Sequence, residues 1–247
     1  MEQTMKSTDK AAIELNHVSY SDEDLDIIKD ISGFLSEGKI TTFVGPSGAG
    51  KTTIFRLLNG LISPTKGDIY LFGKNIQTME PTALRRTVGI ALQDATMLRG
   101  SVYKNLAMPK TLQNQELEKE EAAHLLTQVG LDASFLHRDV TDLSGGQRQK
   151  VSIARTLVNR PKVLLLDEIT SSLDRVSTSD IEQLIQHINQ KFSVTIAWIT
   201  HNLEQALHIG DDTWVMMNGE LVEAGRKDLL KNPADSRVQE FVKGEWQ

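Results

Sequence analysis

The chain of 247 residues contains no cysteine and no long hydrophobic run. The absence of cysteine excludes disulfides, thiolate nucleophiles and cysteine-based zinc sites. The longest apolar stretches, such as Val163–Leu166 and Val194–Ile199, have the length of a strand and are far too short to cross a bilayer. Met1–Lys10 is polar and lacks the apolar core of a signal peptide. We therefore expect the protein to stay on the cytoplasmic side of the membrane.

Excess positive charge is also missing. The chain has 27 Lys and Arg residues against 33 Asp and Glu, a formal net charge of −6, so nucleic acid is not expected as a partner. The length suits one α/β domain with a full core. We expect a single domain over residues 1–247, with a loose tail at residues 1–11. We also expect a mainly helical insert at residues 94–143, because the strand signal stops there and returns at Val163.

What the chain does have is a complete phosphate-binding loop, G-x-x-x-x-G-K-T, between the strand Ile40–Val44 and a helical run. Its glycines let several backbone N–H groups point into one hollow, and the following helix adds its N-terminal partial positive charge. The lysine can reach the β- and γ-phosphates, and the threonine hydroxyl can ligate Mg²⁺. The predicted nucleotide-binding residues are Gly45, Pro46, Ser47, Gly48, Ala49, Gly50, Lys51, Thr52 and Thr53.

A second motif lies at the end of the strand Val163–Leu166, where Asp167 and Glu168 follow directly. Ligands of α/β proteins bind at the carboxyl edge of the sheet, which is where these carboxylates should lie. Neighbouring side chains on a strand face opposite ways, so the two should have different roles. We predict that Asp167 orients the Mg²⁺ shell and that Glu168 acts as the general base for the attacking water.

A third motif, Leu143–Gln147, stands immediately before the amphipathic run Val151–Leu157. Ser144 and Gln147 have the spacing of a capping box, so the motif can be a simple helix start. Gly145 and Gly146 are costly at a position that only caps a helix. They also expose N–H groups at a helix N-terminus, which is a second anion site.

These motifs, in this order, resemble the ATP-binding-cassette (ABC) ATPases over residues 13–225. The resemblance includes Gln93 after its strand, Ser172-Leu173-Asp174, and Thr200-His201 after its strand. It implies a P-loop α/β fold with a RecA-like core and a mainly parallel sheet, an antiparallel β subdomain and a helical insert. It also implies ATP and Mg²⁺ as ligands and ATP hydrolysis as the activity.

The resemblance further implies a head-to-tail homodimer, in which Ser144, Gly145, Gly146 and Gln147 of one subunit complete the site on Lys51 of the other. Gln93 would approach Mg²⁺, beside Thr52 and Asp167. His201 would contact the γ-phosphate and hold the water and Glu168, and Asp174 would cross the dimer interface.

Two positions depart from the family's pattern. Ile169 stands where the family usually has proline, which should change only the local turn. Asp22 stands where many relatives have an aromatic residue under the adenine. Tyr20 can therefore stack on the base or be an inward strand residue, and both readings stay open.

Two functional classes fit the motifs. The first is the energising subunit of a membrane transporter, bound to a separate permease at the cytoplasmic face of the cell membrane. The alternative is a soluble ABC ATPase that acts on DNA or the ribosome, but that class commonly has tandem cassettes, a long coiled coil or zinc-binding cysteines. We favour transport. Ile181-Glu182 and Gln205-Ala206 are similar to phosphate-import subunits, and Trp198 to His201 is similar to iron-export subunits. An inorganic ion is therefore the expected cargo.

Overall fold

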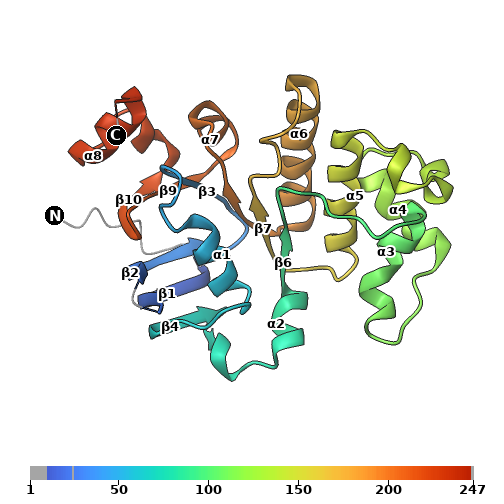
Figure 1. The fold of residues 1–247 in the computed structure, drawn as a ribbon, viewed down its shortest axis with the longest axis horizontal. Helices are drawn as coiled ribbons and strands as arrows, with labels where there is room; N and C mark the ends of the chain where they lie inside the picture. Colours follow the sequence, from blue (N-terminus) through green and yellow to red (C-terminus); the bar gives the residue numbers. More distant parts are fainter. Residues whose placement is uncertain (1–9, 24, 246–247) are drawn as a thin grey trace.

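The computed structural model describes residues 10–23 and 25–245, and it contains two sheets with helices around them. The larger sheet has the strand order β10-β9-β3-β8-β7-β6, and the smaller one the order β2-β1-β4-β5. Figure 1 shows the helical insert at one end of the molecule and the smaller sheet towards the other. No helix among the described residues is both long and apolar enough to span a membrane.

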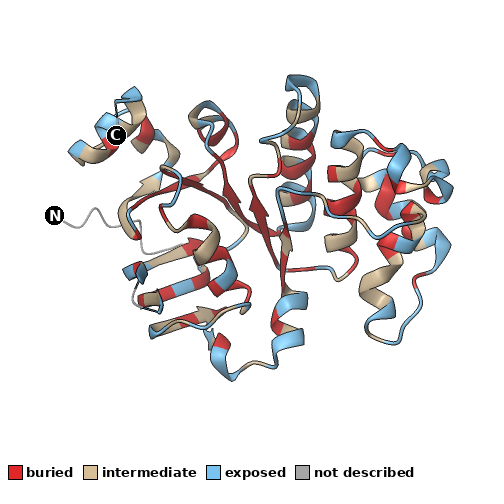
Figure 2. Ribbon diagram, viewed as in Figure 1, coloured by how far each residue is buried: buried red, intermediate tan, exposed pale blue. Residues whose placement is uncertain are grey.

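Five neighbouring strands of the larger sheet, β9, β3, β8, β7 and β6, run parallel, and the C-terminal pair β9 and β10 forms an antiparallel hairpin. The strands are β3 (Ile40–Val44), β6 (Val88–Ala91), β7 (Val163–Asp167), β8 (Thr195–Ile199), β9 (Asp212–Met217) and β10 (Glu220–Arg226). All of β3, β7, β8 and β9 is buried (Figure 2). Strands covered on both faces explain the continuous apolar runs in the sequence.

The alternation of side chains along β7 divides the interior into two cores. Leu164 and Leu166 belong to the cluster under α5, α6 and the helical insert. Val163 and Leu165 belong to the cluster shared with the smaller sheet and α1. A third cluster lies under α7 and α8. The sheet is thus the shared wall of cores on its two sides.

The smaller sheet is antiparallel throughout and pairs residues from the first third of the chain. Its strands are β1 (Ala11–Asp22), β2 (Leu25–Ser36), β4 (Lys66–Leu71) and β5 (Lys74–Asn75). Ala11 already pairs with Ser36, so the predicted tail of residues 1–11 ends too late. The rest of that tail, residues 1–9, lies outside the described residues.

The helices are α1 (Lys51–Leu58), α2 (Pro81–Thr87), α3 (Val102–Thr111), α4 (Lys119–Gln128), α5 (Gly145–Leu157), α6 (Arg175–Phe192), α7 (Leu203–Ile209) and α8 (Ser236–Lys243). Within residues 94–143 the regular elements are helical: α3, α4 and two short 3₁₀ turns. The expected fold class, with its helical insert and antiparallel subdomain, is confirmed. An Asn-Gly pair between two apolar runs predicts a hairpin turn, and Asn218-Gly219 does join β9 to β10, with a positive φ at both residues.

Candidate functional site

The loops that follow β3, β7 and β8 meet at one edge of the sheet, because these three strands are neighbours and run parallel. The phosphate loop follows β3, Glu168 follows β7, and His201 follows β8. Three motifs that are far apart in the sequence are therefore brought together by topology alone.

The phosphate loop is held in its curled form by close backbone packing. Gly45 has a φ of 143°, and a Cβ there would lie 1.9 Å from the carbonyl oxygen of Met216. No other residue fits this position without moving β9. Gly50, with a φ of 94°, begins α1 without a side-chain cap. The amide donors at this helix end are therefore left for an anion, as the sequence predicts.

Lys51 is the first residue of α1 and is only 5% exposed. Its ammonium donates to the carbonyl oxygens of Gly45 and Pro46, each at 2.8 Å. Burial lowers the pKa of Lys51, and the nearby charges of Glu168 and Asp167 partly oppose that shift. A buried cation at the uncapped start of a helix fits the negative charge of a phosphate chain.

Thr52 and Asp167 face each other across the sheet edge. The Thr52 hydroxyl donates to Asp167 Oδ1 at 3.3 Å. Burial raises the pKa of Asp167, the hydrogen bond from Thr52 lowers it, and the Glu168 charge raises it further. A hydroxyl beside a carboxylate is a pair of hard oxygen ligands of the kind that Mg²⁺ prefers, so these two residues fit the ion that accompanies ATP.

Glu168 has a different partner from Asp167 and contacts His201. The distance between His201 Nε2 and Glu168 Oε1 is 2.6 Å. An ionised carboxylate only accepts hydrogen bonds, so with Glu168 in that form Nε2 is the donor of this contact. The two neighbouring carboxylates therefore have different partners, and the division of roles between them stays a prediction.

The backbone of Glu168 is left-handed, with a φ of 49°. A residue with a Cβ is strained there, and such strain is often found at active sites. The carbonyl oxygen of Glu168 accepts hydrogen bonds from the amide of Ser171 at 3.1 Å and from its hydroxyl at 2.9 Å. Ile169, which replaces the proline usual in this position, is buried. The amide of Glu168 itself donates to the carbonyl oxygen of Ile199 at 3.1 Å, so the strained residue is held by β8 as well as by the turn that follows it.

The N-terminus of α5 forms the predicted capping box. Ser144 Oγ accepts from the amide of Gln147, and the Gln147 side chain accepts from the amide of Ser144. Gly146 packs against α6, where a Cβ would lie 2.9 Å from Ser177 Oγ. Ser144 and Gly145 remain exposed beside a hollow of about 310 Å³.

The phosphate loop contributes no residue to the lining of that hollow within the described parts of the chain. In the view of Figure 1, β6 and β7 lie between α1 and α5. The two predicted anion sites are therefore separate features of one chain.

Three further predicted site residues are Gln93, Asp174 and Tyr20. Gln93 is exposed after β6. Asp174 caps α6 by accepting from the amides of Val176 and Ser177, and hydrogen bonds from Ser177 lower its pKa. Tyr20 is half-buried and packs on the core that includes α1, which favours the inward reading of this residue.

Beyond Gln93, the chain forms a groove between the helical insert and the core. Met97, Leu98, Met108 and Pro109 give it an apolar lining around a volume of about 510 Å³. Leu98 is 46% exposed. Arg155 also lines this groove, and burial lowers its pKa.

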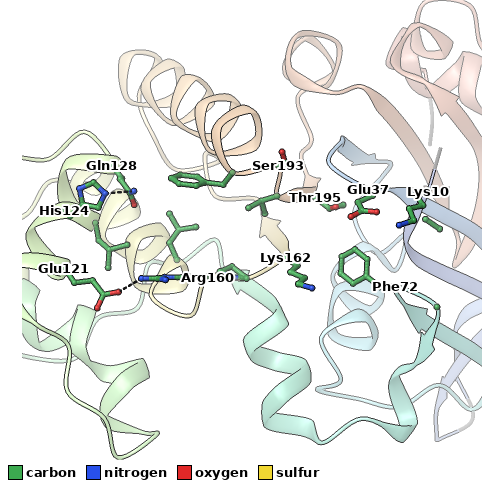
Figure 3. Close-up of a pocket in the computed structure, with 17 residues that line it drawn as sticks. Lys10, Glu37, Phe72, Glu121, His124, Gln128, Arg160, Lys162, Ser193 and Thr195 are labelled. Carbon is green, nitrogen blue, oxygen red and sulfur yellow. Dashed lines mark hydrogen bonds and ion pairs between the residues drawn. The ribbon is translucent and has the colours of Figure 1, made fainter. Parts of the chain in front are cut away.

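A larger hollow, about 1010 Å³, lies at the opposite edge of the sheet (Figure 3). Its lining includes Lys162 and Thr195, at the starts of β7 and β8, together with Phe72 and the ion pair Arg160–Glu121. None of the predicted site residues lines it within the described residues. The predicted catalytic residues therefore lie at the carboxyl edge of the sheet, where the hollows are smaller than this one.

Sequence motifs did not single out Thr170 as a site residue, and Glu182 and Gln205 appeared only in a family similarity. The structure joins these three side chains by hydrogen bonds, and Thr170 and Gln205 line the same hollow as Glu168 and His201. Apart from that similarity, the sequence signal was that Thr170 and Gln205 stand within a few residues of Glu168 and His201.

Comparisons with known proteins agree with this geometry. The family model described as ABC transporter matches residues 28–171. The chain is 40% identical over 220 residues to YjkB of Bacillus subtilis, which is named as an ABC transporter ATP-binding protein; the match covers 89% of this chain and 87% of that protein. It is 36% identical over 222 residues to ABC transporter I family member 17 of Arabidopsis thaliana, covering 90% and 84% of the two chains.

Among solved structures, the chain is similar to cbiO1 of Clostridium perfringens, part of the ABC transporter complex cbiONQ. The TM-score is 0.83 at 27% identity, and 94% of each chain is covered. It is also similar to the dimeric cassette MJ0796 bound to ADP and Pi, with a TM-score of 0.76 and 25% identity, covering 87% of this chain and 98% of that one. The chain belongs to the ABC transporter family, as an ATP-binding and ATP-hydrolysing subunit of a membrane transporter.

Proposed function

We propose that two copies of this chain pair head to tail around two ATP·Mg²⁺ and drive a separate membrane permease. One observation carries the proposal: the two helix ends at Lys51 and Ser144, which the sequence predicts to bind anions, share no hollow within the described residues. A second copy in opposite orientation would bring the Ser144 end of one subunit to the Lys51 loop of the other. The cassette MJ0796, whose solved structure is dimeric, supports this arrangement.

In each site, the residues of one copy would have distinct roles. Lys51 and the loop amides bind phosphate oxygens, and Thr52, Asp167 and Gln93 hold Mg²⁺, which supplies positive charge against the phosphates. Glu168 takes the proton from the attacking water. His201, 2.6 Å from Glu168, keeps that carboxylate pointed at the water.

The dimer can be tested by mixing two inactive variants. Lys51→Ala and Ser144→Arg proteins should each be nearly inactive alone. Their heterodimer has one doubly damaged site and one intact site, so full exchange into random dimers should restore up to about a quarter of the wild-type activity. Activity that does not depend on protein concentration, from a strict monomer, would refute the composite site.

Coupling to the permease would occur at the groove lined by Met97 and Leu98. An apolar groove accepts the apolar face of a helix, and flexible methionine side chains tolerate sliding. Because Gln93 lies close by in sequence, a change at the nucleotide could be passed to the groove. On this basis the subunit sits at the cytoplasmic face of the membrane.

Leu98→Asp should leave ATP binding and thermal stability of the isolated subunit intact, because Leu98 is 46% exposed. Capture of the membrane partner, or substrate-stimulated hydrolysis in membranes, should be lost. Leu112→Asp is the matched control, since Leu112 is 77% exposed and does not line the groove. If both variants behave alike, the groove assignment is wrong; if Leu98→Asp unfolds, Leu98 serves packing.

An inorganic-ion cargo remains a proposal with weaker support. Curated relatives include OpuCA of Bacillus subtilis, named for glycine betaine, carnitine and choline transport, and MetN of Mannheimia succiniciproducens, named for methionine import. Their names do not favour ions. Reconstituting the co-purified permease and finding which solute stimulates ATP hydrolysis tests the cargo directly.

A further inference from the structure

A partly buried polar contact lies beside the Glu168–His201 pair, because two of its residues, Thr170 and Gln205, line the same hollow as that pair. Gln205, on α7, is only 4% exposed. Its amide Nε2 donates to Glu182 Oε1 at 2.7 Å. The same amide contacts the Thr170 hydroxyl, with Nε2 at 3.2 Å and Oε1 at 3.4 Å. One side chain therefore joins α6, α7 and the turn after β7.

Both ends of this contact are close to the reacting groups. Thr170 lies in the turn that begins at Glu168, and that turn is closed by Ser171. Gln205 is in the first turn of α7, where its backbone amide donates to Asn202 Oδ1 at 3.1 Å. The amide of Asn202 donates in turn to Thr200 Oγ1 at 3.0 Å, so the loop that carries His201 is fastened to α7.

Glu182 decides which way the Gln205 amide is turned. A carboxylate only accepts hydrogen bonds, so it selects the nitrogen end of the amide. Glu182 is half-buried, and no lysine, arginine or histidine forms an ion pair with it in the described part of the chain. The Gln205 amide is therefore its protein partner, and burying such a polar contact is costly unless its geometry is well made.

We propose that Gln205 and Glu182 are positioning residues, which hold the turn of Glu168 and the loop of His201 at the separation that hydrolysis needs. The Glu168–His201 hydrogen bond of 2.6 Å is the distance they maintain. This inference rests on the proposed role of Glu168 as the base. Lys51 is held by its own contacts to Gly45 and Pro46, so ATP binding does not depend on the network.

The test is a swap of the two side chains, followed by kcat, KM for ATP and thermal stability. Gln205→Glu sets two carboxylates against each other, and kcat should fall about tenfold with KM within about twofold, since a small displacement of a base costs rate rather than affinity. The double variant Gln205→Glu with Glu182→Gln restores a donor opposite a carboxylate. Its kcat should return to within about threefold of the wild type.

The pH profile separates positioning from simple loss of packing. In Gln205→Glu, acidification lets one carboxyl accept a proton and donate to the other, so the deficit in kcat relative to the wild type should shrink as the pH falls. Glu204→Gln is the matched control, because Glu204 is exposed, lies next to Gln205 in the sequence and carries the same charge as Glu182. Neutralising Glu204 should change neither kcat nor its pH profile.

Three results would overturn the inference: an unchanged kcat in Gln205→Glu, a double variant no more active than the single ones, or a loss that follows the unfolded fraction alone. Should Gln205→Glu not fold, Glu182→Gln and the double variant make the same comparison. Glu168→Gln is measured in parallel. Near-normal turnover in Glu168→Gln removes the proposed base, whereas an inactive Glu168→Gln beside a normal Gln205→Glu removes only the network.

Discussion

Polar groups are in opposite environments at the carboxyl edge of the sheet and at the N-terminus of α5. At the edge, Lys51 and Asp167 are buried with shifted pKa values, and Glu168 has a strained backbone. At α5, Ser144 and Gln147 satisfy each other in a capping box at the surface. Burying these groups and straining Glu168 at the carboxyl edge lowers the stability of the single chain. The start of α5 has no buried charge or strained backbone of this kind, so its function depends on a contact with another molecule.

The largest effect should come from Glu168→Gln, which keeps size and hydrogen bonding but cannot take a proton at the edge. Hydrolysis should fall by at least ~10²-fold. ATP binding should survive, because the phosphate loop is unchanged, and the closed dimer should accumulate. Turnover assays with nucleotide-binding and size-exclusion measurements check this; a variant that turns over at nearly the normal rate would exclude Glu168 as the base.

Asp167→Asn should separate stability from activity at the same edge. Burial raises the pKa of Asp167 above its unfolded value, so the charged form is disfavoured in the fold and stability rises as the pH falls through the raised pKa. The amide removes that penalty at neutral pH and can still accept from Thr52. We expect a Tm higher by about 3 °C, a difference that disappears on acidification, and hydrolysis at least about tenfold slower.

Thermal melts between neutral and acid pH, alongside ATPase assays, test this prediction. A lower Tm at neutral pH would mean that the charge of Asp167 stabilises the fold, and the contrast drawn above between the two regions would be wrong.

The smallest effect should be on stability at the start of α5. Ser144→Ala removes the cap and should cost about 1 kcal/mol of unfolding free energy. Ser144→Asp is the control that keeps a cap acceptor, so it should melt like the wild type. Its negative charge should still reduce hydrolysis in the dimer, because it would repel a phosphate brought by the partner. Denaturant titrations and assays of both variants decide whether Ser144 serves only as a cap.

The sequence predicted most of the regular secondary structure. Apolar runs such as Val163–Leu166 marked buried parallel strands, and Asn218-Gly219 marked the hairpin, because strand burial and turn chemistry are local properties. The ends of strands were predicted less accurately. The strand β1 begins at Ala11, because pairing with Ser36 extends it beyond its apolar pattern. Gly145 and Gly146 also admitted two readings from the sequence alone.

The contact of Gln205 with Glu182 and Thr170 was beyond reach of the sequence. Gln205 and Glu182 lie on different helices, and their hydrogen bond depends on how closely α6 and α7 approach each other behind the site. A polar residue at a buried helix position gives no local sign of its partner. The choice between stacking and packing for Tyr20 likewise depended on which core β1 covers.

The left-handed backbone of Glu168 has a consequence for evolution and engineering. Glycine adopts this conformation without strain, so Glu168→Gly would relax the turn and delete the base in a single step. A selection for heat resistance alone would therefore reward inactive proteins at this position. A search for more stable forms of this subunit therefore needs an activity screen at every round, because a gain in stability at this position leads away from function.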